Sequence, residues 1–122
     1  MAGNPKFGKR IRKLREAKRR EDPTFSLRQF AERVGISATF LSKVETGEFD
    51  PPRAEKIIKM AELLEIDPDE LLALAGKMDP ELGEIILDQP KAIADFLRTA
   101  REKGLTAEDI ERITKNLKRR RP

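Results

Sequence analysis

The sequence predicts an all-α protein, and three observations support this class. Apolar residues recur at spacings of three and four along most of the chain, which is the periodicity of an amphipathic helix. Glycines and capping residues stand between these segments, where helices stop and start. Proline follows an acidic capping residue at the expected helix start Asp67-Pro68. We therefore expect a helical domain over residues 1–75 and a further helical segment over residues 76–122.

The composition excludes several kinds of chemistry. The chain has 122 residues, enough for one compact domain and an appendage, and it contains no cysteine and no histidine. Disulfides, thiolate nucleophiles and imidazole bases or ligands are therefore excluded. No apolar run reaches the roughly 18 residues of a membrane span, and the N-terminus is polar and basic. We expect a cytoplasmic protein that is not an enzyme and has no catalytic residues, metal site, cofactor or membrane partner.

Charge is spread unevenly, although the net charge is only +4. Both ends of the chain are basic, whereas residues 62–88 are acidic. A basic zone suits a polyanionic partner, but by itself it fits a solvated helix face equally well. The cations at the two ends are Lys6, Lys9, Arg10, Arg12, Lys13, Arg15, Lys18, Arg19, Arg20, Lys115, Lys118, Arg119, Arg120 and Arg121.

A first helix is expected over residues 6–20, after a loose arm at residues 1–5. Its apolar residues are spaced three or four apart, and the opposite face is almost wholly Lys and Arg. Asp22-Pro23 ends this helix, so residues 20–25 should form a loop. Phe25 is placed to pack back onto the next helix, which Ser26 caps. The expected core residues are Phe7, Ile11, Leu14 and Ala17.

Residues 26–47 predict two short helices joined by a tight turn. Gly35 suits a left-handed bend, and Ser37 caps the second helix. The small Ala31, followed four positions later by glycine and then by apolar residues, is typical of a DNA-binding helix-turn-helix. Any αα-hairpin with a glycine in its bend shares part of this pattern. The expected core residues of the pair are Leu27, Phe30, Ala31, Val34, Phe40, Leu41 and Val44.

Two further helices complete the predicted domain. One covers residues 53–64, after an extended loop that Pro51 and Pro52 stiffen. The other starts at Asp67-Pro68, where the acidic cap and Glu70 predict a capping box. The expected core residues of these helices are Ile57, Ile58, Ala61, Leu64, Leu71, Leu72 and Leu74.

The order of these segments resembles that in the Cro and phage-repressor class of helix-turn-helix domains, the XRE family. The segments that carry the resemblance are residues 7–16, the helix pair at 26–47, Pro52 and residues 60–72. The resemblance spans residues 7–74. It implies a lambda-repressor-like five-helix DNA-binding domain in a transcriptional regulator whose partner is double-stranded DNA. It also implies that Arg15 and Glu45 form a partly buried bidentate pair, which ties the first helix to the third.

The resemblance further implies which residues meet DNA. The helix over residues 37–46 would enter the major groove, with its outward side chains at base edges and its N-terminus at a phosphate. Lys43 could donate to guanine or contact a phosphate, and both alternatives stay open. The expected base-reading residues are Ala38, Thr39, Ser42, Lys43 and Thr46. The expected phosphate or minor-groove contacts are Arg10, Arg28, Gln29, Ser37 and Arg53.

Three positions depart from the family pattern. Leu27 stands where many relatives carry a phosphate-binding glutamine, so Arg28 or Gln29 would have to replace that contact. Glu48 and Asp50 stand where relatives often have Lys or Asn, and their carboxylates would repel phosphate. Arg53 is therefore the best candidate for a DNA contact in that loop.

The last third of the chain predicts three short helical pieces, over residues 80–87, 90–103 and from Thr106 onward. Short helices with so many large apolar residues cannot bury them alone. The helix-Gly-Leu-Thr-helix pattern over residues 96–117 resembles the oligomerisation hairpin of SinR-type repressors. It implies a homodimer through these helices, although packing back onto the first domain is the alternative. The expected dimerisation residues are Ile93, Phe96, Leu97, Ile110, Ile113 and Leu117.

These features favour a dimeric, sequence-specific regulator, most often a repressor in this family, on a near-palindromic operator. A second hypothesis is an antitoxin that binds a toxin or another protein antagonist through its tail and regulates its own operon. A third is a protein-interaction module of the same fold that does not bind DNA. An enzyme is disfavoured, because the sequence has no phosphate-binding glycine loop and its carboxylates fall on caps or solvent faces.

Overall fold

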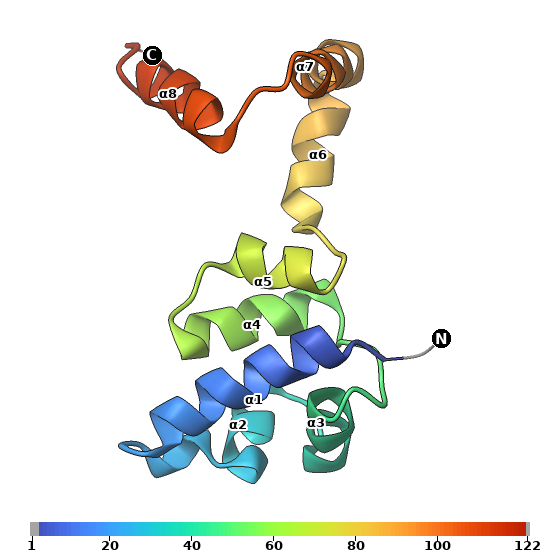
Figure 1. Cartoon of the computed structure of the whole chain (residues 1–122), viewed down its shortest axis with the longest axis vertical. Coiled ribbons are helices and arrows are strands. Elements are labelled where there is room, and N and C mark those ends of the chain that lie inside the picture. The colour runs from blue at the N-terminus through green and yellow to red at the C-terminus, as the bar shows by residue number, and fades with distance from the viewer. Residues whose placement is uncertain (1–2, 122) are drawn as a thin grey trace. The chain divides into compact units, whose positions relative to one another are not determined.

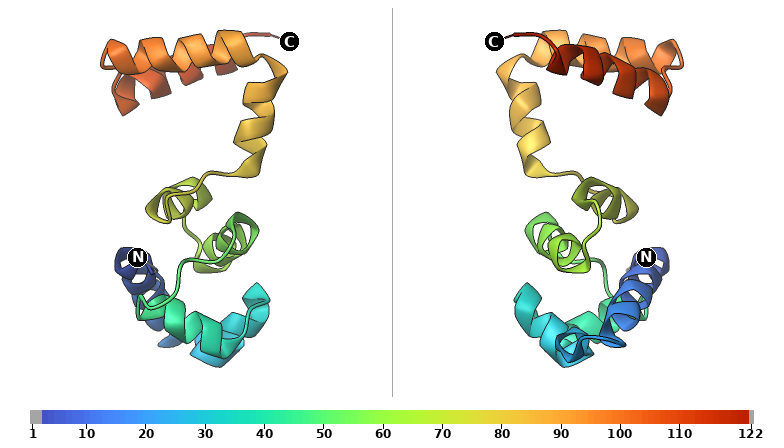
Figure 2. Two further views of the ribbon diagram at one scale, coloured as in Figure 1. Left: turned by 90° about the vertical axis from the view of Figure 1, so that its right-hand side faces the viewer. Right: turned by 90° about the vertical axis from the view of Figure 1, so that its left-hand side faces the viewer.

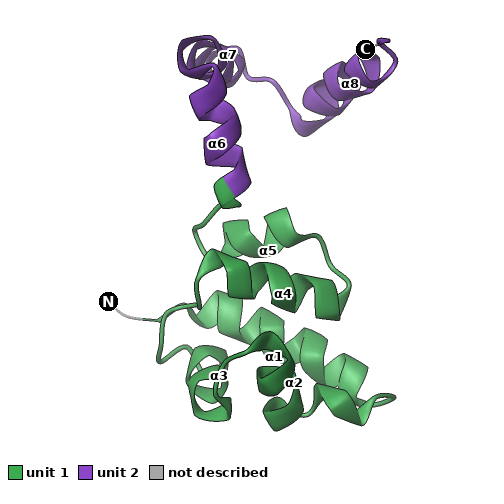
Figure 3. Cartoon of the chain, turned by 180° about the vertical axis from the view of Figure 1, so that it is seen from behind, with its two compact units in different colours: residues 1–80 green, residues 81–122 purple. Residues whose placement is uncertain are grey.

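The computed structural model describes residues 3–121, and this part of the chain is all-helical, as the sequence predicts (Figure 1). It divides into two compact units, residues 1–80 and 81–122 (Figure 3). The division therefore falls five residues after the boundary at residue 75 that the sequence predicts. The elements, in order, are α1 (Pro5–Arg19), the 3-10 helix η1 (Pro23–Phe25), α2 (Leu27–Val34), α3 (Ala38–Glu45), α4 (Ala54–Leu64), α5 (Pro68–Leu74), α6 (Pro80–Asp88), α7 (Pro90–Glu102) and α8 (Ala107–Lys118).

The first unit contains one hydrophobic core, to which α1 to α5 and η1 all contribute. Helices α4 and α5 lie side by side in each view, and α1 packs against α3 (Figures 1 and 2). The fully buried large side chains are Phe7, Ile11, Phe30, Leu41, Val44, Ile57, Met60, Leu71 and Leu72. This core supports the helices that the sequence assigned to the first domain.

One core assignment is wrong, and five of the predicted core residues are only partly buried and pack against the core from its edge: Leu14, Leu27, Phe40, Ile58 and Leu74. Ala17 is exposed, because the buried stripe of α1 runs through Ile11 and Arg15 and position 17 lies past it. α4 also buries Met60, which lies three positions after Ile57 and was not among the predicted core residues, while Ile58 is only partly buried at the edge of that stripe. Phe40 is also only partly buried, and its ring lies against exposed Phe49 with centroids 6.1 Å apart.

Local capping sets the geometry of the α2–α3 pair. Gly35 has a φ of 88°, and its N–H donates to the carbonyls of Ala31 and Glu32, which ends α2 in a left-handed turn. Ser37 Oγ then accepts from the N–H of Phe40 at 3.0 Å and begins α3. The sequence predicted both devices, because each depends only on residues a few positions apart.

The segment before α2 is more ordered than the expected loop. Residues 23–25 form a 3-10 turn, in which Asp22 accepts from the N–H and the hydroxyl of Thr24. Phe25 is buried and its ring stacks on Phe30 at 5.8 Å, which is the contact expected of a hydrophobic staple. The start of α2 is therefore attached to the core on both sides of its cap.

The N-terminal segment is not a loose arm within the described residues, and residues 1–2 lie outside them. Asn4 caps α1 by accepting from the N–H of Phe7, and its side-chain amide donates to the carbonyl of Leu74 at 3.1 Å. The Gly3 N–H donates to Asp50 at 2.7 Å. These bonds link the start of α1 to the end of α5 and to the loop after α3.

The second unit has no buried residue in any of its three helices, α6, α7 and α8. Gly104 ends α7 with a φ of 67°, and Thr106 begins α8 with a capping box to Asp109. In the described part of the chain no helix is long and apolar enough to cross a membrane. The large apolar side chains that this unit leaves exposed are Leu82, Ile85, Leu87, Phe96, Leu97, Ile110, Ile113 and Leu117.

Candidate nucleic-acid interface

Helix α3 has one buried face and one outward face. Leu41 and Val44 are buried, whereas Thr39 and Thr46 are exposed. The five predicted base-reading residues are spaced one, three or four positions apart, so the helix periodicity brings them to one side. Ala38 is partly buried and packs against the core, and Ser42 is partly buried as well. Thr39 and Thr46 are the exposed members of this set, and the Lys43 side chain is 41% exposed.

The C-terminal end of α3 is closed by a Schellman turn. Gly47 has a φ of 83° and donates its N–H to the carbonyl of Val44, and the N–H of Glu48 donates to the carbonyl of Lys43 at 2.9 Å. This turn fixes the backbone of Glu48 directly beside Lys43.

Two outward residues of α3 are bonded to Glu48. The Lys43 ammonium lies 3.3 Å from Glu48 Oε1, and the Thr46 hydroxyl donates to Glu48 Oε2 at 2.9 Å. The Thr46 hydrogen bond, with that of Lys43, lowers the pKa of Glu48 below its usual range. The sequence predicts Glu48 only as a carboxylate that repels phosphate, and this contact was not predicted. The signal was present in the spacing, since the residue after a C-terminal glycine folds back over the last helical turn.

The predicted phosphate contacts fall in different places. Arg28 and Gln29 are exposed at the start of α2, and Ser37 is exposed at the start of α3. The Arg53 side chain is 82% exposed and pairs with Glu55 at 3.1 Å, just before α4. Arg10 instead lines a shallow cleft of about 220 Å³ together with Asp67, Glu70 and apolar residues of α5. Its neighbours are thus acidic side chains of α5 rather than outward residues of α3.

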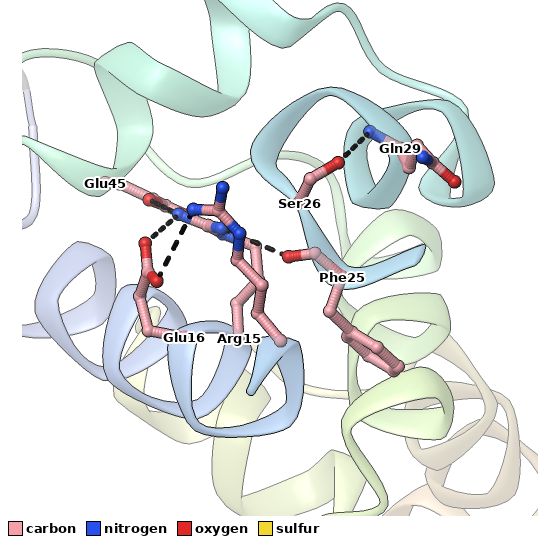
Figure 4. A network of polar contacts seen from close by, with 7 residues as sticks. Arg15, Glu16, Phe25, Ser26, Gln29 and Glu45 are labelled. Atoms are coloured by element: carbon pink, nitrogen blue, oxygen red, sulfur yellow. Dashed lines mark hydrogen bonds and ion pairs between the residues drawn. The ribbon is translucent and has the colours of Figure 1, made fainter. Parts of the chain in front are cut away.

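Arg15 and Glu45 form a bidentate ion pair between α1 and α3 (Figure 4). Arg15 Nε and Nη2 donate to the two Glu45 oxygens at 2.8 and 2.9 Å, and Nη1 donates to the carbonyl of Phe25 at 3.1 Å. The two residues are only 3% and 8% exposed. The hydrogen bond to Glu45 raises the pKa of Arg15 despite its burial, so the guanidinium stays charged. A single side chain thereby joins α1, α3 and η1.

Close backbone packing accompanies this pair. A Cβ added at Gly8 would lie 2.2 Å from the carbonyl oxygen of Val44, far inside van der Waals contact. Only glycine therefore allows α1 to approach the end of α3 this closely. The position of α3 is set by the missing side chain of Gly8 on one turn of α1 and by the charge of Arg15 two turns later.

An amphipathic helix pair with a glycine turn, whose second helix presents polar side chains outward, is the arrangement found in helix-turn-helix DNA-binding domains. The model of a family described as a helix-turn-helix domain matches residues 8–77, more than half of the chain. The protein therefore belongs to this family, of the XRE type, whose members are DNA-binding transcriptional regulators and not enzymes. The expectations of the fold and of a non-enzymatic protein are confirmed by this membership.

Three curated relatives illustrate the similarity. The uncharacterized HTH-type transcriptional regulator RghRB of Bacillus subtilis is 27% identical over 89% of this chain and 86% of its own length. The uncharacterized regulator Rv0474 of Mycobacterium tuberculosis is 34% identical over 70% of this chain and 59% of its own. The HTH-type transcriptional repressor RghR of B. subtilis is 33% identical over 60% of this chain and 50% of its own length. The chain thus spans little more than half the length of the last two, and no solved structure matches it.

The buried pair gives a stability prediction. Replacing Arg15 by Ala leaves the Glu45 carboxylate buried without its partner, so the free energy of unfolding should fall by about 3–5 kcal/mol. Urea denaturation followed by circular dichroism measures this change. The matched control is Arg19→Ala on the same helix, where the side chain is 53% exposed and 3.7 Å from Glu16. The control should stay within about 0.5 kcal/mol of wild type, and equal losses in the two variants would contradict a structural role for the Arg15–Glu45 pair.

Proposed function

We propose that the protein is a sequence-specific repressor that binds a near-palindromic operator as a homodimer. The observation that carries this proposal is the outward face of α3. Thr39, Lys43 and Thr46 project from a helix whose opposite face is buried and whose C-terminal end is tied to α1 by the Glu45–Arg15 pair. A helix held in this way can enter the major groove without losing contact with its own domain.

The chemistry of the exposed residues suits this role. Lys43 can donate to the O6 and N7 of guanine, and the methyl groups of Thr39 and Ala38 can pack on a thymine methyl. Ser42 can donate or accept at a base edge, and the Thr46 hydroxyl, which donates to Glu48, can still accept from a base amine. Donors for the phosphates come from residues before and after this helix in the chain, namely Arg28, Gln29, Ser37 and Arg53. Phosphate contacts fix the register of the protein on the duplex but carry no sequence information. Arg10, the remaining proposed phosphate or minor-groove contact, is exposed on α1 and also lines the cleft against α5.

The second unit supports the homodimer. Three amphipathic helices whose large apolar residues stay exposed are stabilised when another apolar surface covers them. A second copy of the same helices provides a self-complementary surface related by a two-fold axis. The side chains proposed for this interface are Ile93, which is partly buried, and exposed Phe96, Leu97, Ile110, Ile113 and Leu117. The two recognition helices of such a dimer would enter successive major grooves about 34 Å apart. Because a two-fold axis relates the helices, the two half-sites would form a near-palindrome.

Repression is the proposed outcome of binding. One relative, RghR, is named a transcriptional repressor, and its matched region covers 60% of this chain. A dimer that occupies a promoter blocks polymerase by steric exclusion and needs no catalytic residue. The proposal therefore asks of this chain only tight, selective binding to one duplex.

Selection of bound duplexes from a random library tests the proposal directly. Purified full-length protein should enrich one half-site in inverted repeat, with the half-sites separated by about one helical turn of 10–10.5 base pairs. Enrichment of a single unrepeated site would refute dimeric recognition. A chain that binds no duplex even at low salt would instead be a protein-interaction module of the same fold.

Lys43 gives a prediction on the selected operator. Lys43→Ala should weaken binding to the operator by roughly 1–3 kcal/mol if the ammonium reads a base, and should weaken binding to a random duplex much less. Fluorescence anisotropy on both duplexes measures the difference. Lys59→Ala is the matched control, because Lys59 is an exposed lysine on α4 that pairs with Glu62. An equal loss on the operator and on random DNA would make Lys43 a phosphate contact instead.

Phe96 gives a prediction on assembly. It is 55% exposed on α7, and truncating it to Ala should raise the dimer dissociation constant by about tenfold or more, as expected for an aromatic anchor of an interface. Sedimentation velocity over a concentration series gives this constant. Arg98→Ala, two residues along the same helix and also exposed, should leave it unchanged. A dimer unaffected by Phe96→Ala would move the interface away from α7.

A further inference from the structure

Glu45 and Glu48 lie three residues apart, and the structure puts them in opposite environments. Glu45 is buried against Arg15, whereas the Glu48 side chain is 57% exposed beside Lys43. The Schellman turn causes this difference, because Gly47 reverses the chain and brings Glu48 back over the last turn of α3. A carboxylate is thereby fixed on the face that the proposed function assigns to DNA.

The contacts of Glu48 hold it there as an anion. Its Oε2 accepts from the Thr46 hydroxyl at 2.9 Å, and its Oε1 lies 3.3 Å from the Lys43 ammonium. An exposed ion pair of this kind is weak, so DNA can compete for Lys43. Two contacts that do not involve the ammonium keep Glu48 next to Lys43 when DNA competes for it. The Thr46 hydroxyl, which also lies 3.1 Å from the Lys43 carbonyl, contacts the carboxylate, and the Glu48 N–H donates to the Lys43 carbonyl.

The neighbouring acidic residue has a different role. Asp50 accepts from the Gly3 N–H at 2.7 Å and so connects the loop to the start of α1. Of the acidic residues in the loop after α3, Glu48 is the one bonded to outward side chains of the recognition helix.

A charged carboxylate beside Lys43 acts differently on the two kinds of acceptor that DNA offers. A phosphate that approaches Lys43 carries a full negative charge and is repelled by Glu48. The O6 and N7 atoms of guanine are neutral acceptors, so they can share the ammonium with Glu48 at little cost. Glu48 can also accept from the N4 amine of a neighbouring cytosine. The carboxylate therefore favours base edges over the backbone.

We propose that Glu48 is a specificity-determining residue, which keeps Lys43 from phosphate and reserves it for a base edge. This inference rests on the proposed DNA-binding function. It assigns to Lys43 the base-reading role that the sequence left open, and it turns an apparently unfavourable carboxylate into a source of discrimination. Its effect is to weaken binding to random DNA more than binding to the operator.

The test replaces Glu48 by Gln, which keeps the shape and removes the charge. Binding of the full-length variant to a random duplex should tighten about two- to fivefold, the range of one exposed ion pair. The slope of log affinity against log salt on that duplex should steepen by about 0.9, because Lys43 now contacts a phosphate. Binding to the selected operator should gain less, so the ratio of operator to random affinity should fall.

The matched control is Glu62→Gln, which removes the same charge from a side chain that is 63% exposed and pairs with Lys59 on α4. If it changes both affinities as much as Glu48→Gln does, the effect is one of net charge and the inference is overturned. A second check combines Glu48→Gln with Lys43→Ala. The tightening on random DNA should disappear in this background, and its persistence would overturn the link to Lys43.

Failure of the inference and failure of the proposed function give different results. If wild type prefers its selected operator but Glu48→Gln leaves the ratio unchanged, only the role of Glu48 is wrong. If wild type binds all duplexes equally, or none, the proposed function itself is refuted and the inference with it.

Discussion

The Arg15–Glu45 pair is the interaction on which the position of α3, the proposed DNA-binding helix, depends. Two charges removed from water must satisfy each other, and here two hydrogen bonds of 2.8 and 2.9 Å fix the distance and the orientation of both side chains. Arg15 also binds the carbonyl of Phe25, so one guanidinium positions α1, α3 and the turn before α2. Such a pair adds little net stability compared with an apolar contact, but removing one partner leaves a buried charge uncompensated.

The two sides of α3 differ in what they contact. Leu41 and Val44 attach the helix to the core, and Gly8 lets α1 approach without a side chain in the way. The opposite side is left to polar residues of moderate size, whose donors and acceptors suit base edges. Glu48 joins these residues only because the chain reverses at Gly47. The turn that ends the recognition helix therefore also sets the charge next to it.

The two units differ in how they are stabilised. The first encloses large apolar side chains completely, as Phe7 and Met60 show, whereas the helices of the second unit bury none of theirs. Local signals mark the helix ends in the second unit: the left-handed Gly104 follows α7, and the capping box at Thr106 begins α8. A second copy would complete that surface, and in that arrangement assembly and operator geometry are set by the same contact.

The sequence by itself determined the α-helices, the turn at Gly35 and the caps at Ser26, Ser37 and Thr106, because capping and periodicity act between residues at most a few positions apart. It also indicated which side of α3 faces outward. It did not predict the cap at Asn4 or the 3-10 turn at residues 23–25. The tertiary structure decided which residues at the edge of a stripe are buried: Met60 rather than Ile58, and the charged Arg15 rather than Ala17. It likewise placed Arg10 against α5, Asn4 against Leu74 and Glu48 against Lys43. These outcomes depend on which neighbouring helix or turn covers each position, and that information is not local in the chain.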